Sequence, residues 1–142
     1  MNKSLYLKIL VPVDGSSYSD KALAHACELA KAQKAVLLLM YVIDKSIPLN
    51  FLDRKEYLSI LRRYGKKIIK KASETATRRG VSSKQIIKEG SVSKEIIKTA
   101  KNQKCNLIIV GSKGLGATER FFLGSTSTKL AADSPCSVLI VK

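Results

Sequence analysis

The stretch LIIVGSKGLGATERFFLGSTST, residues 107–128, indicates most directly how this chain folds and what it holds. It opens with the apolar run 107–110, which breaks at Gly111 and continues through three more glycines to Gly124. A hydroxyl-rich segment, residues 125–128, then begins a helical pattern. A buried strand that leads through a glycine-rich loop into a helix N-terminus presents backbone N–H groups to an anion. The stretch therefore predicts a site for the phosphates of a nucleotide.

The flanking sequence alternates between apolar runs and helical patterns. Runs rich in Val, Ile and Leu predict five strands, at residues 5–13, 35–43, 83–88, 107–110 and 138–141. Helical spacing of apolar residues predicts helices between them, at residues 17–33, 53–79, 92–104 and 125–133. Ser17 or Ser19 is expected to cap the first helix, and Ser91 the third. Strict alternation predicts an α/β fold: a three-layer, doubly wound parallel sheet with helices on both faces. We expect residues 1–142 to form one domain.

The composition favours anionic partners and a reducing compartment. The chain has 26 Lys and Arg against 11 Asp and Glu, a formal net charge of +15, which attracts nucleotides, nucleic acid or an anionic surface. Its three cysteines, Cys27, Cys105 and Cys136, are widely spaced and match neither a disulfide framework nor a zinc site. No apolar stretch reaches the length of a membrane span or a signal sequence. We expect a soluble, cytoplasmic protein without a membrane partner.

The glycine-rich loop differs from two common phosphate cradles. Residues 111–118 have the glycine spacing of a Walker A loop, but Ala117 stands where that loop requires lysine. A dinucleotide fingerprint of the form G-x-G-x-x-G is absent, and the loop follows the fourth predicted strand instead of the first. The pattern that does fit is Gly111-x2-Gly114-x9-Gly124-Ser125.

This motif, together with VPVDGS at residues 11–16, resembles the universal stress protein family in its ATP-binding branch. The VID ending of the second predicted strand, residues 42–44, and the closing P-x-S-V-L-I-V-K, residues 135–142, match in the same order. The resemblance covers essentially the whole chain. It implies a five-stranded parallel sheet of order 3-2-1-4-5, which places the ends of the first and fourth strands, at Asp14 and Gly111, beside one crevice.

The predicted nucleotide site combines these two strand ends. Glycine at 111, 114 and 124 would let the backbone approach a triphosphate and allow positive φ. The hydroxyls at 125–127 would donate to phosphate oxygens, and Lys113 would add a charge or point to water. The resemblance implies that Asp14 accepts hydrogen bonds from the ribose and that the backbone near Val13 and Val42 meets the adenine edge. An alternative for Asp14 is an Asx turn or helix cap, which is compatible with binding. The predicted cofactor-binding residues are Pro12, Val13, Asp14, Val42, Val110, Gly111, Lys113, Gly114, Gly124, Ser125, Thr126 and Ser127.

The sequence favours nucleotide binding over catalysis. The single histidine, His25, lies within the first predicted helix, and no paired carboxylates or metal-ligand cluster stand out. Glu119 lies inside the motif; action on water or on a Mg²⁺ shell is its alternative role, and no catalytic role is assigned to it. We predict no catalytic and no metal-ligating residues, and a cofactor that is ATP, with or without Mg²⁺. The expected function is a nucleotide-dependent regulatory module with little or no hydrolysis. An adenylyl-type enzyme is the competing catalytic hypothesis and would need more acid–base residues than this chain offers.

Two further partners are considered. The resemblance implies a homodimer that forms through the apolar C-terminal strand, residues 138–141, at the sheet edge. A nucleic-acid-binding function is the alternative hypothesis, and no nucleic-acid-binding signature accompanies it. It would use one basic helix face, made of Arg62, Arg63, Lys66, Lys67, Lys70 and Lys71.

Overall fold

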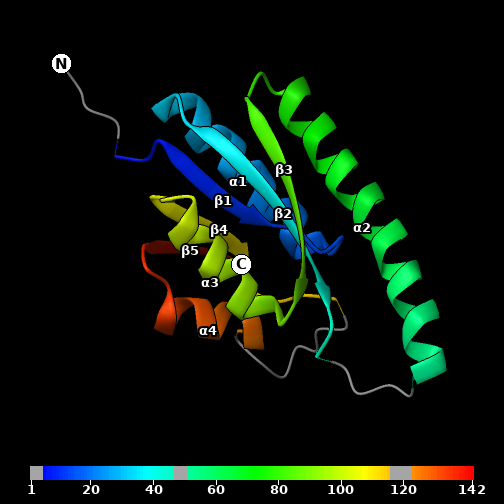
Figure 1. The fold of residues 1–142 in the computed structure, drawn as a ribbon. Coiled ribbons are helices and arrows are strands. Elements are labelled where there is room, and N and C mark those ends of the chain that lie inside the picture. The colour runs from blue at the N-terminus through cyan, green and yellow to red at the C-terminus, as the bar shows by residue number, and fades with distance from the viewer. Residues whose placement is uncertain (1–4, 47–50, 116–122) are drawn as a thin grey trace.

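The computed structural model, which describes residues 5–46, 51–115 and 123–142, contains one parallel sheet with helices on both faces (Figure 1). The five strands in these ranges have the order β3-β2-β1-β4-β5, so the predicted α/β fold and strand order are confirmed. The elements in chain order are β1 (Lys8–Pro12), α1 (Ser17–Gln33), β2 (Val36–Asp44), α2 (Phe51–Arg78), β3 (Ser83–Gly90), α3 (Val92–Asn102), β4 (Leu107–Gly111), α4 (Ser125–Asp133) and β5 (Ser137–Val141).

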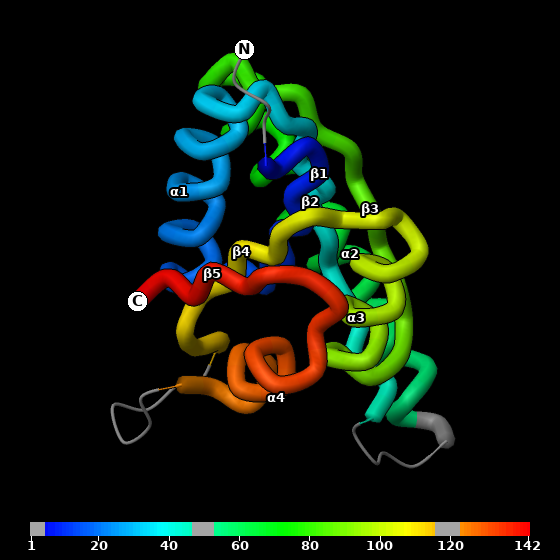
Figure 2. Tube along the Cα trace, turned by 90° about the vertical axis from the view of Figure 1, so that its left-hand side faces the viewer, coloured from blue at the N-terminus to red at the C-terminus, as the bar shows by residue number. Residues whose placement is uncertain are grey.

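The side chains of each strand alternate between two buried clusters, because successive residues of a strand point to opposite faces. Ile9 and Val11 of β1 pack in the cluster under α1 and α2, whereas Leu10 packs in the cluster under α3 and α4. Strands buried on both faces require the nearly continuous apolar runs seen in the sequence. Figure 2 shows β5, the last strand of the chain, beside β4. Helix α4, which comes just before β5 in the chain, lies below the sheet in this view.

The central pair of strands creates the switch point of the fold. β1 pairs with β4 in parallel, with Ile9 opposite Leu107, so their carboxyl ends meet at one edge. After β1 the chain enters α1 on one face, and after β4 it enters α4 on the other face. The two connections diverge there and leave a crevice, which is where open α/β sheets bind ligands.

Several local expectations are corrected by the structure. The N-cap of α1 is Ser16, whose hydroxyl accepts a hydrogen bond from the Ser19 N–H at 3.1 Å; neither Ser17 nor Ser19 is the cap. Ser91 is the N-cap of α3, as predicted, but makes no side-chain capping bond. Helix α2 begins at Phe51, two residues before the predicted start. Sequence spacing shows which residues of a helix share a face. Which residue caps the helix depends on how the preceding segment enters it, and the spacing does not show that.

No helix in the described ranges is both long enough and apolar enough to cross a membrane. The sequence also predicts a helical turn near residues 119–122, and these residues lie outside the described ranges.

Candidate functional site

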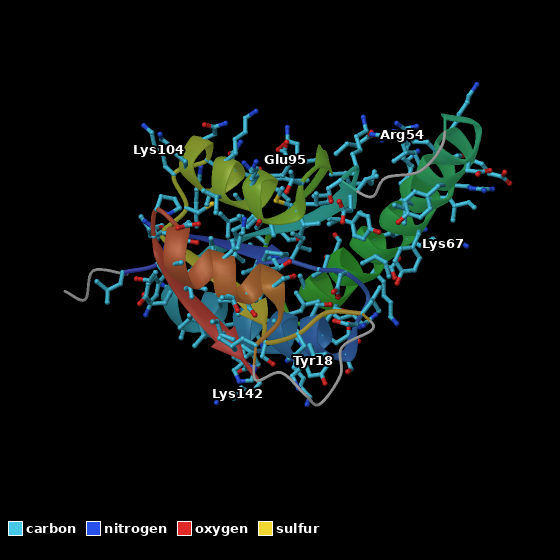
Figure 3. All side chains as sticks on the ribbon, turned by 90° about the horizontal axis from the view of Figure 1, so that it is seen from below. Tyr18, Arg54, Lys67, Glu95, Lys104 and Lys142 are labelled. Atoms are coloured by element: carbon cyan, nitrogen blue, oxygen red, sulfur yellow. The ribbon has the colours of Figure 1, made fainter. Side chains whose placement is uncertain are left out.

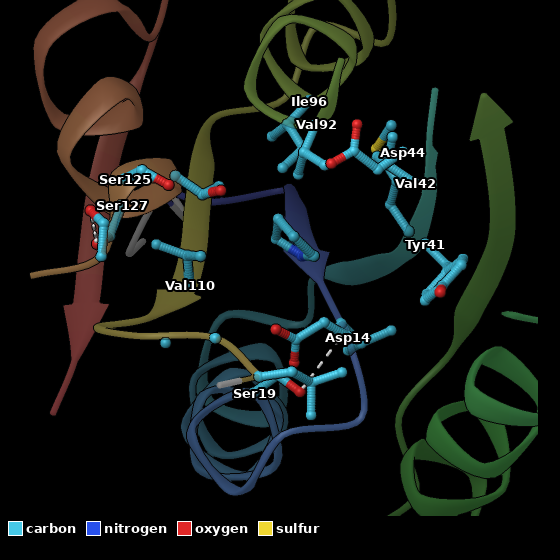
Figure 4. Close-up of a pocket in the computed structure, with 18 of the residues that line it drawn as sticks. Asp14, Ser19, Tyr41, Val42, Asp44, Val92, Ile96, Val110, Ser125 and Ser127 are labelled. Carbon is cyan, nitrogen blue, oxygen red and sulfur yellow. Dashed lines mark hydrogen bonds between the residues drawn. The ribbon is translucent and has the colours of Figure 1, made fainter. Parts of the chain in front are cut away.

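A cavity of about 630 Å³ opens at the carboxyl ends of β1, β2 and β4 (Figure 4). All twelve residues predicted to bind the cofactor line this cavity. It also has nine lining residues that sequence reasoning did not assign to the site: Ser19, Met40, Tyr41, Asp44, Tyr57, Leu61, Val92, Ile96 and Leu115. Most of them belong to ordinary strand or helix patterns, and only the fold brings them to this edge.

Asp14 is held in place through three of its polar groups. Its Oδ1 accepts a hydrogen bond from the Ser16 N–H at 2.8 Å, which is the Asx turn considered from the sequence. Its own N–H donates to the Ser19 hydroxyl at 3.4 Å, the dashed line in Figure 4. Its backbone carbonyl accepts from the Tyr64 hydroxyl at 3.3 Å. The remaining carboxylate oxygen, Oδ2, lies toward Gly114.

The two glycines of the loop serve different contacts. A Cβ atom on Gly114 would lie 2.8 Å from Oδ2 of Asp14, so the absence of a side chain leaves room for that carboxylate. A Cβ atom on Gly111 would lie 2.8 Å from the backbone carbon and oxygen of Tyr18, so Gly111 allows α1 to pack closely against β4. The positive φ that glycine would allow is not adopted here: of the glycines in the described ranges, only Gly15, Gly80 and Gly90 have positive φ.

Gly124 is the N-cap of α4, and its backbone conformation is one that any residue can adopt. Its φ is −76° as the N-cap, and its N–H donates to the Ser112 carbonyl at 2.7 Å. This bond joins the start of α4 to the end of β4, so the two halves of the motif lie together. The first N–H groups of a helix, here at residues 125–127, have no partner within the helix and face outward from its N-terminus.

The three hydroxyl residues at the start of α4 differ in exposure. Ser125 is exposed and Thr126 is half-buried, and both line the cavity. Ser127 is buried, and its Oγ lies 2.9 Å from the Ser112 carbonyl oxygen and 3.1 Å from that of Gly124. A serine hydroxyl has one proton, so the two carbonyl oxygens share this donor. The bond to Ser112 connects the loop after β4 to α4.

Lys113 brings a positive charge to the rim of the cavity. Its Nζ lies 6.0 Å from the centroid of the Tyr18 ring, within the range of a cation–π contact. The side chain is half-buried. This contact places the ammonium group beside the Tyr18 ring of α1.

The end of β2 contributes Tyr41 and Asp44 to the cavity lining. Tyr41 packs edge-on against Tyr64, with 6.0 Å between ring centroids and 67° between ring planes. Burial, with smaller contributions from the neighbouring Tyr64, Tyr57 and Asp14, raises the pKa of Tyr41 to about 12. Asp44 is a second carboxylate in the lining, and its Oδ1 accepts hydrogen bonds from the Ser46 N–H at 2.9 Å and hydroxyl at 2.6 Å.

Comparison with known proteins identifies the family. The model of the universal stress protein family matches residues 5–142. The chain belongs to the universal stress protein family. Universal stress protein YxiE of Bacillus subtilis is 35% identical over 150 residues, covering 97% of this chain and 100% of the relative.

Solved universal stress proteins share the fold. The protein UspA from Lactobacillus plantarum superposes with a TM-score of 0.90 at 26% identity, covering 96% of this chain and 98% of UspA. A universal stress protein in complex with cAMP superposes with a TM-score of 0.73 at 25% identity, covering 96% of each chain.

The basic face of α2 in this universal stress protein is only partly free. Arg62 forms a two-bond ion pair with Glu89 of β3, with both N···O distances 2.8 Å, and Lys45 lies 3.1 Å from the same carboxylate. The hydrogen bond from Arg62, followed by that from Lys45, lowers the pKa of Glu89 to about 2. The other five basic residues of this face are exposed, and Figure 3 shows Lys67 on the outer side of α2.

The single histidine of the chain belongs to α1. His25 is exposed on α1, where its Nδ1 lies 3.0 Å from the Lys21 carbonyl oxygen. It does not line the cavity. Glu119 lies outside the described residues.

Proposed function

We propose that this universal stress protein binds an adenine nucleotide, ATP, in the cavity between Asp14 and α4, and acts as a nucleotide-dependent regulatory module. One observation carries the proposal: the Asp14 carboxylate lies directly beside the Cβ-free backbone of Gly114, in the lining of a cavity that also includes the N-terminus of α4. A carboxylate suits ribose hydroxyls, and a helix N-terminus suits phosphates. A cavity of about 630 Å³ is within the usual range for small-molecule sites. The relative in complex with cAMP supports the class of ligand.

The residues around the cavity suggest one orientation of the nucleotide. Oδ2 of Asp14 would accept from the ribose, because Oδ1 already holds the Asx turn. The phosphates would extend over Gly114 toward the N–H groups of residues 125–127, with the Lys113 ammonium group nearby. The adenine would lie toward Val42. The Val13 N–H donates to the Met40 carbonyl at 2.8 Å, so Val13 would offer the base its carbonyl or its side chain.

Binding without turnover is the expected chemistry. A hydrolase needs a base that can activate water. Asp14 and Asp44, the two carboxylates in the described part of the lining, each hold an Asx turn through one oxygen. This arrangement suits them to a positioning role better than to proton transfer. Steady release of phosphate or pyrophosphate at enzyme-like rates would instead favour the catalytic hypothesis.

The test is to denature the purified protein and identify any nucleotide that it releases. Calorimetric titration with ATP, AMP, cAMP and GTP then ranks the ligands, and repeating the ATP titration in EDTA and in Mg²⁺ tests the metal. We expect adenine nucleotides to bind more tightly than GTP. A protein that releases no nucleotide and binds none in the titration would overturn the proposal.

We also propose that the protein is a cytoplasmic homodimer joined through β5. This strand ends the sheet next to β4, and its Leu139 is 40% exposed. An edge strand with an exposed apolar side chain favours pairing with a second copy. The three free thiols, Cys27, Cys105 and Cys136, suit a reducing compartment. Cell fractionation tests the location.

Nucleic-acid binding by the basic face of α2 stays a prediction, and the ion pair of Arg62 with Glu89 leaves it five exposed basic residues. Affinity for duplex or single-stranded nucleic acid that falls steeply with salt, and is lost when Lys66, Lys67, Lys70 and Lys71 are reversed in charge, would support it.

A further inference from the structure

Helix α2 contacts the Asp14 turn from the side opposite the glycine loop. The Tyr64 hydroxyl donates to the Asp14 backbone carbonyl at 3.3 Å. The next residue, Gly65, lies so close to β2 that a Cβ atom there would be 2.5 Å from Cδ1 of the Tyr41 ring. Glycine inside a helix lowers its stability relative to alanine. Here its small size allows α2 to pack against β2 at the level of Tyr64.

The residue after Asp14 is also enclosed by α2. Gly15 has a φ of +87°, a backbone conformation that favours glycine. A Cβ atom on Gly15 would overlap the Tyr64 hydroxyl and lie 2.8 Å from Cδ1 of Ile68. The turn at residues 14–15 is therefore packed directly under α2, with no space for a side chain between them.

Asp14 thus lies between two segments that are distant in the sequence. Tyr64 holds its carbonyl from α2, and Gly114 leaves room for Oδ2 on the cavity side. The Asx turn to the Ser16 N–H constrains Oδ1. The direction of Oδ2 depends on the position of the Asp14 backbone, and Tyr64 helps to hold that position from α2.

We propose that Tyr64 is a positioning residue for ribose recognition, acting through the Asp14 carboxylate. The inference rests on the proposed function, because it assumes that the cavity binds a ribonucleotide through Asp14. It assigns to α2 a part in binding that its sequence does not suggest, since Tyr64 belongs to the apolar face of an amphipathic helix.

The test uses Tyr64→Phe, which removes the hydroxyl and keeps the ring that packs against Tyr41. Affinities for ATP and for 2′,3′-dideoxy-ATP are measured by calorimetry for the wild type and the variant. We expect ATP to bind about fivefold more weakly to the variant, the effect of one neutral hydrogen bond. The affinity for the dideoxy nucleotide is expected to stay unchanged, because that ligand lacks the hydroxyls that Asp14 would accept from.

The matched control is Tyr6→Phe, a partly buried tyrosine that packs against the core under α1 and α2 and does not line the cavity. It should leave both affinities unchanged. A second measurement repeats Tyr64→Phe in an Asp14→Ala background. The Tyr64 bond goes to the backbone carbonyl, so Asp14→Ala keeps that bond and removes the carboxylate together with its Asx turn to the Ser16 N–H. Tyr64→Phe should then have no further effect on ATP affinity.

The outcomes separate this inference from the proposed function. If the wild type binds no ATP, the proposed function fails. If it binds ATP but Tyr64→Phe leaves that affinity unchanged, the positioning role fails. Equal weakening for ATP and its dideoxy analogue, or equal weakening with and without the Asp14 carboxylate, would show that Tyr64 acts on the fold as a whole and would also overturn the inference.

Discussion

Oδ2 of Asp14 lies 2.8 Å from the position that a Cβ atom on Gly114 would occupy, although 100 positions separate the two residues in the chain. This distance joins the end of β1 to the loop after β4. A side chain at 114 would have to displace either the carboxylate or the loop, so the pair provides a direct test of the site.

Gly114→Ala should weaken ATP binding about tenfold or more by displacing the Asp14 carboxylate, which corresponds to roughly 1.4 kcal/mol. The fold should remain, because the Cβ meets a side-chain oxygen at the cavity and no backbone. Calorimetry and thermal melting of the same sample check both statements. Gly114→Val should enlarge the binding defect. Unchanged affinity in Gly114→Ala would contradict the proposed site.

Gly111→Ala should destabilise the fold by about 1–3 kcal/mol, the usual result of overpacking a core. The new methyl group would meet the Tyr18 backbone, which belongs to α1 and has no room to rotate away. Urea denaturation measures the change. The matched control is Gly124→Ala, since a Cβ there has its nearest neighbour at 3.4 Å and φ is −76°. A smaller loss for Gly111 than for Gly124 would show that the packing argument is wrong.

Asp14→Asn should remove the preference for ATP over 2′,3′-dideoxy-ATP while leaving the turn intact. The amide keeps an oxygen that can accept from the Ser16 N–H, as Oδ1 of Asp14 does. It replaces the charged acceptor that would face the ribose, at a cost of roughly 1.5–3 kcal/mol in ATP affinity. Titration of both nucleotides against wild type and variant gives the result. A variant that still discriminates between them would show that another group recognises the ribose.

Glu89 should make stability depend on acid pH. Its pKa in the folded protein is lowered to about 2 from an ordinary 4.5 by hydrogen bonds from Arg62 and then Lys45. The stabilisation is therefore present above about pH 4.5 and is lost as the pH falls toward 2. Because these side chains are 30–47% exposed, we expect no more than about 1 kcal/mol.

Urea unfolding of wild type and Glu89→Gln, compared near pH 6 and near pH 3, checks the size and sign of this effect. The difference between the two proteins should shrink at the lower pH and at high salt. A difference that grows on acidification would contradict the assignment.

Leu139→Lys should convert the proposed homodimer into a monomer, because it places a charge on the exposed face of β5. The mass in solution at micromolar concentration, measured by light scattering or sedimentation, decides the matter. The control is Ile87→Lys on β3, the opposite edge strand, where the side chain is similarly exposed at 37%. A wild-type protein that is itself monomeric would refute the β5 interface.

The sequence predicted all five strands to within three residues, and it predicted the strand ends that line the cavity. These predictions succeeded because buried parallel strands need long apolar runs and because their carboxyl ends share one edge. The role of individual glycines could not be predicted in this way. Gly111 ends β4 and Gly114 follows it by three residues, yet one faces the Tyr18 backbone and the other the Asp14 carboxylate.

The sequence by itself determined the alternation of strands and helices, and through the G-x2-G-x9-G-S motif the location of the proposed anion site. Only the tertiary structure decided which helical side chains reach that site. Tyr57, Leu61 and Tyr64 follow the same helical spacing as the core residues of α2, and Arg62 has the same charge as its neighbours. Their contacts differ because the N-terminal half of α2 lies beside the strand ends. Long-range packing sets this placement, and no local sequence pattern shows it.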